Sequence, residues 1–181
     1  DFGYLTDAMV FEGELPISQL MIQPKAEGEI AFRLSKDLRG PGVTAADVLA
    51  ATESVHPCFE IVDSRIADWK IAIEDTVADN ASSGAFVIGA PVSPHGLDFP
   101  ALKMTVTKNG APLSQGLGAA ALGSPLNCVA WLANTLGAFD VPLLAGEIIL
   151  SGSLVPLEPV VAGDTMRADV SGLGAVEVRF T

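Results

Sequence analysis

Residues 24 to 32 read P-K-A-E-G-E-I-A-F, and this stretch decides the fold because its residues alternate with the period of a β-strand. The alternation puts Glu27 and Glu29 on one face and Ile30 and Phe32 on the other. The apolar face predicts a strand that packs on a core. The other face points two carboxylates the same way, which raises the question of what neutralises them.

Two carboxylates at positions i and i+2 of a strand have Cβ atoms roughly 6 to 7 Å apart. In a low-dielectric cleft they repel each other, and one of them takes up a proton. A divalent cation removes that penalty, and Mg²⁺ or Mn²⁺ usually needs a third oxygen ligand from the protein. Glu60 lies among apolar neighbours in a separate strand-like segment, where a lone carboxylate is costly, so it is the candidate third ligand. The spacing alone leaves an alternative open, in which Glu27 and Glu29 line the wet face of an edge strand and pair with Lys25 or Arg33.

The rest of the chain is mostly short strands. The pattern predicts a short strand and a loop in residues 1 to 20, a helix over about 45 to 53, a boundary at Pro57 and a strand from 58 to 66. Residues 75 to 84 are polar and turn-rich, and a buried strand follows them. Asn109-Gly110 predicts a type I′ hairpin, and Ser124-Pro125 opens a second helix that ends near Gly137. Further strands are expected near 147–153, 165–170 and 175–180.

The two helices stand apart from the strands, which predicts a strand-rich α+β fold. The 181 residues suit a single domain, and 49% hydrophobic with 18% charged residues is a globular composition. No apolar run is long enough to cross a bilayer. A net charge of −12 argues against nucleic acid or an anionic membrane as a partner.

Cysteine and histidine usage narrows the chemistry further. Cys58 and Cys128 are isolated in apolar surroundings, which predicts buried free thiols and a reducing, cytoplasmic compartment. His56 and His95 have no cysteine at ligand spacing, so a zinc site is not expected. His56 is interpreted as a structural or solvent-exposed residue and His95 as a loop residue. No G-x-S-x-G motif and no glycine-rich phosphate loop is present.

Four ordered segments carry a family resemblance: K-A-E-G-E-I-A-F, F-E-I-V-D-S-R-I, D-T-V-A-D-N-A-S-S-G and I-I-L-S-G-S. Together they resemble the fumarylacetoacetate hydrolase superfamily, and in particular its branch of 2-hydroxypenta-2,4-dienoate hydratases and 4-oxalocrotonate decarboxylases. The resemblance covers nearly the whole chain. It implies a mixed β-sheet roll with a few peripheral helices.

The resemblance also implies roles for particular residues. Mg²⁺ or Mn²⁺ is expected on Glu27, Glu29 and Glu60. The remaining expected site residues fall into a catalytic group and a substrate-binding group, namely Asp1, Asp79 and Arg65, and Ser151, Gly152 and Ser153. Alternatives stay open for several of them: a turn-forming role for Asp79 and Asn80, an ordinary strand-end turn at 151–153, and an ion pair of Arg65 with Asp63 or Asp68.

The opening D-F-G-Y matches a family segment whose acidic residue falls on Asp1. In the family this residue works with a lysine further upstream, which no position of this chain matches. We therefore expect residues 1–181 to be the C-terminal catalytic domain of the family, with an N-terminal segment before it.

The expected activity is that of a hydro-lyase that adds water to 2-hydroxypenta-2,4-dienoate in the meta-cleavage degradation of aromatic compounds. A 4-oxalocrotonate decarboxylase is the first alternative, and a C–C bond hydrolase or a non-catalytic partner subunit are the others. The expected partners are a small 2-oxo acid, further copies of the chain in a homo-oligomer, and a pathway partner enzyme.

Overall fold

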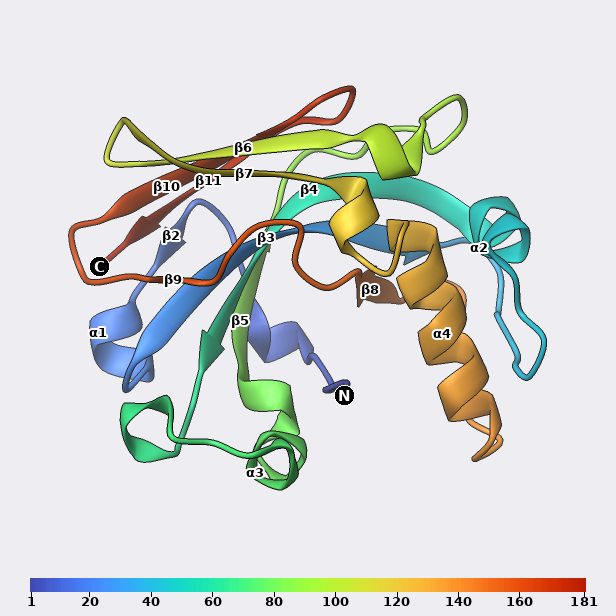
Figure 1. The fold of residues 1–181 in the computed structure, drawn as a ribbon, viewed down its shortest axis with the longest axis horizontal. Coiled ribbons are helices and arrows are strands. Elements are labelled where there is room, and N and C mark those ends of the chain that lie inside the picture. Colours follow the sequence, from blue (N-terminus) through green and yellow to red (C-terminus); the bar gives the residue numbers. More distant parts are fainter.

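The computed structural model describes residues 1–181 and contains two β-sheets that pack face to face (Figure 1). The six-stranded sheet has the order β1-β5-β4-β3-β8, and β9 pairs with β3 beside β8. Its strands are β1 (Val10–Phe11), β5 (Ser83–Ile88), β4 (Thr52–Asp63), β3 (Pro24–Leu34), β8 (Ile148–Leu150) and β9 (Glu158–Pro159). The five-stranded sheet, in order, consists of β2 (Glu14–Leu15), β11 (Gly174–Phe180), β10 (Thr165–Val170), β6 (Lys103–Lys108) and β7 (Ala111–Leu117).

Both sheets are mixed, because β1 runs parallel to β5 and β2 runs parallel to β11 while the other pairs are antiparallel. Four short α-helices accompany the sheets, namely α1 (Ile17–Leu20), α2 (Ala45–Ala51), α3 (Ile73–Ala78) and α4 (Pro125–Gly137). The strand-rich α+β class is thereby confirmed. None of these helices is long and apolar enough to cross a membrane.

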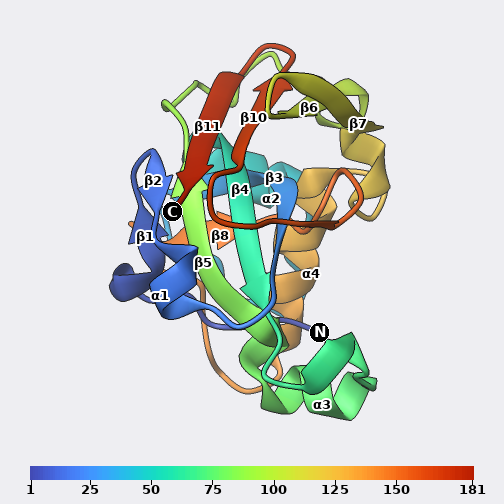
Figure 2. The same cartoon turned by 90° about the vertical axis from the view of Figure 1, so that its left-hand side faces the viewer.

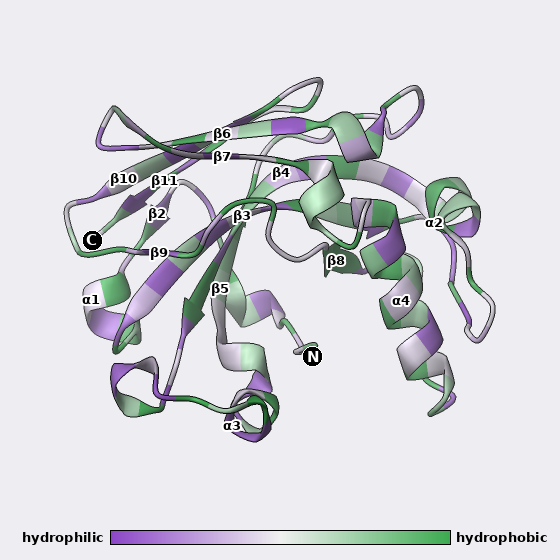
Figure 3. Ribbon diagram, viewed as in Figure 1, coloured by the Kyte–Doolittle hydropathy of each residue, from purple (hydrophilic) through white to green (hydrophobic).

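The core lies between the two sheets. Ile30 and Phe32 of β3 and Phe59 and Ile61 of β4 are fully buried there, as the strand alternation predicts. Phe32 also stacks on Phe99 with ring centroids 5.6 Å apart. Figure 3 shows the hydrophilic positions of β3 mainly in its first half, where both glutamates lie.

The opposite side of the six-stranded sheet faces the helices. Figures 1 and 2 both show α4 and α3 on this side, away from the five-stranded sheet, with the N-terminus between them. The outward-facing side chains of β3 and β4 therefore point into the region that α4, α3 and the N-terminal segment surround.

The boundary expected at Pro57 is wrong, because β4 begins at Thr52 directly after α2 and continues through Pro57 to Asp63. The Pro57 carbonyl accepts a hydrogen bond of 2.8 Å from the Gly89 N–H, just past the end of β5. The backbone nitrogen of Pro57 points to the same side, toward Gly89 and past the end of β5. Its missing N–H therefore removes no hydrogen bond between β4 and β5.

Two further local expectations need correction. The turn-rich stretch 75–84 is helical in its first part, where α3 begins after Ala72 and the Asp75 carboxylate accepts a 2.9 Å bond from the Ala72 N–H. The first 20 residues form two separate two-residue strands and α1, since each strand finds its partner far along the chain. The hairpin at Asn109-Gly110 is confirmed, with φ of 54° and 77° as a type I′ turn requires.

Candidate metal centre

The register of β3 and β4 brings the three predicted metal ligands together. Glu27 lies directly opposite Glu60, and Glu29 lies opposite Cys58. One carboxylate oxygen from each of Glu27, Glu29 and Glu60 lies within 4.8 Å of the others. This is the donor set and spacing that a hard divalent cation takes in proteins.

The edge-strand alternative is wrong. β3 is paired on both sides, by β4 on one and by β8 and β9 on the other. Neither proposed basic partner reaches the glutamates, because Arg33 pairs with Glu53 at 3.4 Å and the Lys25 ammonium lies 4.2 Å above the Trp69 ring. The two carboxylates of β3 thus share a face without a neutralising cation from the protein.

The electrostatics of the cluster follow from this arrangement. None of the three glutamates forms a salt bridge. Burial raises the pKa of Glu29 well above its usual value, and the charges of Glu60 and Glu27 raise it further. Burial and then the charge of Glu27 raise the pKa of Glu60 to about 7, against the opposing effect of the Ser83 hydroxyl. Burial also raises the pKa of Glu27, which the Ser153 hydroxyl partly opposes.

Glu29 has one carboxylate oxygen to spare. Its Oε2 accepts a hydrogen bond of 2.8 Å from the Gly152 N–H, while its Oε1 is buried and has no hydrogen-bond partner. The residue is only 1% exposed, so bulk water cannot hydrogen-bond to this oxygen, and the desolvation cost of the oxygen remains. A divalent cation in the centre of the cluster would satisfy Oε1, and the residues present therefore fit such an ion.

The predicted substrate-binding segment follows β8 and touches the cluster. The Ser151 hydroxyl accepts from the Ile30 N–H at 3.2 Å and donates to the Gly152 carbonyl at 2.9 Å, which ties the segment to β3. Gly152 has a φ of 82°, a conformation that favours glycine, and in it the Gly152 N–H reaches Glu29. The Ser153 hydroxyl donates to the Val155 carbonyl. The segment is thus a turn fixed by hydrogen bonds, and its Gly152 N–H holds the carboxylate of Glu29.

Packing on the opposite face of β3 explains why the residue between the two glutamates is a glycine. A Cβ atom on Gly28 would lie 2.3 Å from the Met104 sulfur of β6 and 3.2 Å from a Val155 methyl carbon. Met104 of the five-stranded sheet therefore packs closely against β3 behind the carboxylate cluster. Because glycine has no side chain, the core can pack tightly against β3 on the face opposite to both glutamates.

Asp79 and Arg65 pair with each other and not with the glutamates of the cluster. The Arg65 Nε lies 2.8 Å from the Asp79 Oδ1, and the Arg65 N–H donates to the Asp79 Oδ2 at 3.1 Å. The Arg65 guanidinium also donates to the Ser83 carbonyl at 3.4 Å. The ion pairs expected for Arg65 are wrong. Its guanidinium donates to the Asp63 carbonyl, but the Asp63 carboxylate accepts from the Ile22 and Gln23 N–H groups, and Asp68 pairs with Lys70.

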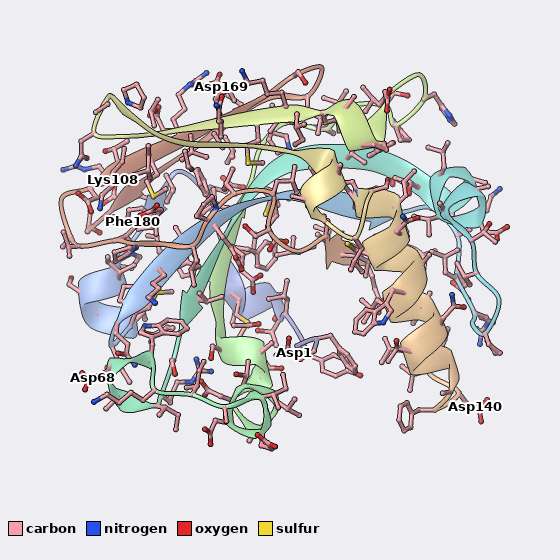
Figure 4. The ribbon with its side chains drawn as sticks, in the orientation of Figure 1. Asp1, Asp68, Lys108, Asp140, Asp169 and Phe180 are labelled. Atoms are coloured by element: carbon pink, nitrogen blue, oxygen red, sulfur yellow. The ribbon has the colours of Figure 1, made fainter.

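The N-terminal segment packs beside the cluster. Figure 4 shows Asp1 on the helix-bearing side of the six-stranded sheet, and its side chain is exposed. Next to it, the Phe2 ring meets Trp131 of α4 edge to face at 6.3 Å. A Cβ atom on Gly3 would lie 2.9 Å from the Ser83 hydroxyl oxygen, so this segment lies directly against the neighbour of Glu60.

Two residues of this region are not evident from the sequence. Ser83 reaches Glu60 only because β5 pairs with β4, and its place at the start of a buried strand is the one local signal. Burial, and to a smaller extent the charge of Glu29, raise the pKa of the Cys128 thiol in α4 to about 11. Both cysteines are free; Cys58 is buried as expected, whereas Cys128 is only half-buried.

Known proteins resemble this chain throughout its length. The family model described as the fumarylacetoacetate (FAA) hydrolase C-terminal domain matches residues 5–181. A 2-hydroxyhexa-2,4-dienoate hydratase from Comamonas testosteroni is 60% identical over 185 residues, which cover 100% of this chain and 70% of the relative. A 2-hydroxypent-2,4-dienoate hydratase from Pseudomonas putida is 70% identical over 144 residues, which cover 78% of this chain and 65% of the relative.

A solved structure shares the fold. The 4-oxalocrotonate decarboxylase from Pseudomonas putida G7, complexed with magnesium and adipate, superposes with a TM-score of 0.95 at 38% identity over 99% of this chain and 69% of that one. This chain thus spans roughly two thirds of the length of these proteins. The expected sheet roll with peripheral helices is confirmed, and the chain belongs to the fumarylacetoacetate hydrolase family.

Proposed function

We propose that this chain belongs to a hydro-lyase that adds water to 2-hydroxypenta-2,4-dienoate and forms 4-hydroxy-2-oxopentanoate. The observation that carries the proposal is the cluster of Glu27, Glu29 and Glu60, in which Glu29 is buried and its Oε1 has no hydrogen-bond partner. It occurs in a chain that is 60% identical to a hydratase of a closely similar dienoate over its full length.

The metal that suits this donor set is Mg²⁺ or Mn²⁺, held by Glu27, Glu29 and Glu60. When bound, such an ion supplies Lewis-acid polarisation to the oxygen atoms of a 2-oxo acid. The three carboxylates bind it best when deprotonated, so metal and protons compete for the same oxygens. The Gly152 N–H donates to the Glu29 Oε2 and so holds this carboxylate in place.

The reaction needs proton transfers and one addition of water. A proton leaves the 2-hydroxyl group and another arrives at C5, which gives the conjugated 2-oxo-3-enoate. The oxygen of water then adds at C4 and a proton at C3, so that the product contains all atoms of the dienoate and one water. Asp1 lies on the N-terminal segment beside the cluster and is the carboxylate that we assign to these proton transfers.

The other predicted residues take supporting roles. The segment from Ser151 to Ser153 borders the cluster and holds the carboxylate end of the substrate. Arg65 is fixed by Asp79 and bonds the carbonyl of Ser83, so this pair supports the edge of the site next to Glu60.

A decarboxylation is the second candidate, since the decarboxylase from strain G7 has a TM-score of 0.95 to this chain. The same polarised 2-oxo acid would serve both reactions. The two substrates separate the candidates. We expect the purified protein with Mg²⁺ to consume 2-hydroxypenta-2,4-dienoate and yield 4-hydroxy-2-oxopentanoate. Release of carbon dioxide from 4-oxalocrotonate without hydration of the dienoate would refute the proposal.

The assembly and compartment are part of the same proposal. We assign the protein to the cytoplasm, where Cys58 and Cys128 stay reduced, as a homo-oligomer that can join a pathway partner enzyme. Size-exclusion chromatography with light scattering tests the oligomer, and a monomeric mass at all concentrations would contradict it.

A further inference from the structure

The turn between α3 and β5 has an unusual backbone. Asn80, Ala81 and Ser82 have φ values of 55°, 56° and 54°, so three successive residues with side chains lie in the left-handed region. Asparagine tolerates this region, but alanine and serine are disfavoured there. Such a conformation persists only where its surroundings fix it, and here the Ser82 N–H and hydroxyl both bond to Asp79.

The turn directs the Asn80 side chain away from its own loop. The Asn80 Oδ1 accepts from the Tyr4 N–H at 2.8 Å, and the Asn80 Nδ2 donates to the Tyr4 carbonyl at 2.9 Å. One amide group thus makes both hydrogen bonds to the backbone of a residue 76 positions earlier in the chain. A paired contact of this kind fixes the register of the N-terminal segment as a rung of a β-ladder does.

The segment that Asn80 holds is the one that borders the carboxylate cluster. A Cβ atom on Gly3 would lie 2.4 Å from the Asn80 carbonyl oxygen and 2.9 Å from the Ser83 hydroxyl oxygen, so the backbone of Gly3 fits closely between them. Ser83 in turn contacts Glu60. Asp1 precedes Gly3 by two residues, and its position depends on the same contacts.

An ordinary turn-forming asparagine would bond to its own backbone within a few residues. Asn80 makes no such bond with its side chain, and both of its amide hydrogen bonds reach Tyr4. The three left-handed residues therefore serve to present this amide group to the N-terminal segment.

We infer that Asn80 is a positioning residue for the proton-transfer step, which holds the segment carrying Asp1 in register against the metal-binding glutamates. The inference rests on the proposed function, since it assumes that Asp1 acts on a substrate at this cluster. It assigns Asn80 an effect on turnover and none on the binding of the metal.

Asn80→Gly tests this inference because glycine keeps the left-handed backbone and removes only the amide clamp. We expect kcat to fall by about 10- to 100-fold, as for a misplaced catalytic group, with KM within about threefold of wild type. The Mg²⁺ affinity from calorimetry and the melting temperature should stay close to those of wild type. Asn80→Asp, which can accept from the Tyr4 N–H but not donate to the carbonyl, should retain an intermediate kcat.

Ala81→Gly is the matched control, because it makes the same backbone more permissive one residue along and removes no hydrogen bond. We expect it to keep the wild-type kcat. A wild-type kcat in Asn80→Gly would overturn the inference. So would an equal loss of kcat in Ala81→Gly, or a loss of Mg²⁺ affinity in Asn80→Gly that accounts for its lost activity.

Hydrogen exchange keeps the inference separate from the proposed function. In the full chain, the Tyr4 amide should be protected in wild type and Ala81→Gly and should exchange faster in Asn80→Gly. Absence of hydratase activity in the wild type would refute the proposed function. Protection of the Tyr4 amide that is unchanged in Asn80→Gly would refute the clamp itself.

Discussion

The Glu60→Gln substitution should stabilise the metal-free protein at neutral and alkaline pH. Glu60 carries its usual pKa of 4.5 in the unfolded chain and a pKa of about 7 in the folded one, chiefly because burial disfavours its charge. One pH unit of such a difference corresponds to about 1.4 kcal/mol, so the rise corresponds to roughly 3 kcal/mol. Glutamine has nearly the same shape and no charge, and it removes this penalty.

The sign of the pH dependence follows from the raised pKa. Below pH 4.5 Glu60 is protonated in both states, and the substitution should leave the free energy of unfolding almost unchanged. As the pH rises from 4.5 through about 7, the unfolded chain releases the proton more readily than the folded one. Wild type then loses stability, and the advantage of Glu60→Gln should approach at most roughly 3 kcal/mol near pH 8.

Urea unfolding with a chelator present, followed by the fluorescence of Trp69 and Trp131, measures both free energies across this pH range. Addition of Mg²⁺ at 1,000 times its dissociation constant for wild type should reverse the order, since it stabilises wild type by about 4.1 kcal/mol and the variant by much less. Glu12→Gln makes the same chemical change at an exposed position. It should neither raise the free energy of unfolding without metal nor change the response to Mg²⁺. A metal-free wild type whose stability does not fall between pH 4.5 and 8 would refute the reasoning, as would a Glu60→Gln variant less stable than wild type at pH 8.

Three other substitutions probe the same region. Glu29→Gln should abolish Mg²⁺-dependent turnover with little loss of folding, because relief of repulsion offsets the lost ligand; wild-type turnover at saturating metal would contradict the ligand assignment. Gly28→Ala should destabilise the protein by about 1 to 3 kcal/mol through contact with Met104, and the double variant with Met104→Ala should show favourable coupling in urea unfolding; additive effects would argue against the contact. Gly152→Ala should cost about 1 to 2 kcal/mol of stability by left-handed strain and weaken Mg²⁺ binding in calorimetry; unchanged affinity would show that the Gly152 N–H does not orient Glu29.

The carboxylate cluster explains why stability and function should oppose each other here. One buried glutamate and two half-buried ones without basic partners destabilise the metal-free fold, yet the same lack of partners leaves their oxygens available to a cation. Behind the cluster, Gly28 packs closely against Met104 of the core. The proposed metal site therefore predicts that metal binding and folding are thermodynamically linked.

Local sequence determined those elements whose signal lies within a few residues. The alternation in β3 predicts which side chains face the core, and it puts Glu27 and Glu29 on one face wherever the strand lies. Asn109-Gly110 and Ser124-Pro125 likewise set a turn and a helix start through their own backbone preferences. The four ordered motifs also sufficed to predict the family and the three clustered glutamates.

Only the tertiary structure decided the contacts that join distant segments. No local pattern shows that Pro57 can lie inside β4, because that depends on where β5 ends. The partner of Arg65 is Asp79 rather than a nearer aspartate, since the turn before β5 carries Asp79 back to the end of β4. The hydrogen bonds between Asn80 and Tyr4 likewise join groups 76 residues apart. Backbone sterics and side-chain periodicity act over a few residues and can be read in the sequence. Strand register, burial and the pKa values that follow from them depend on which distant segments share the core.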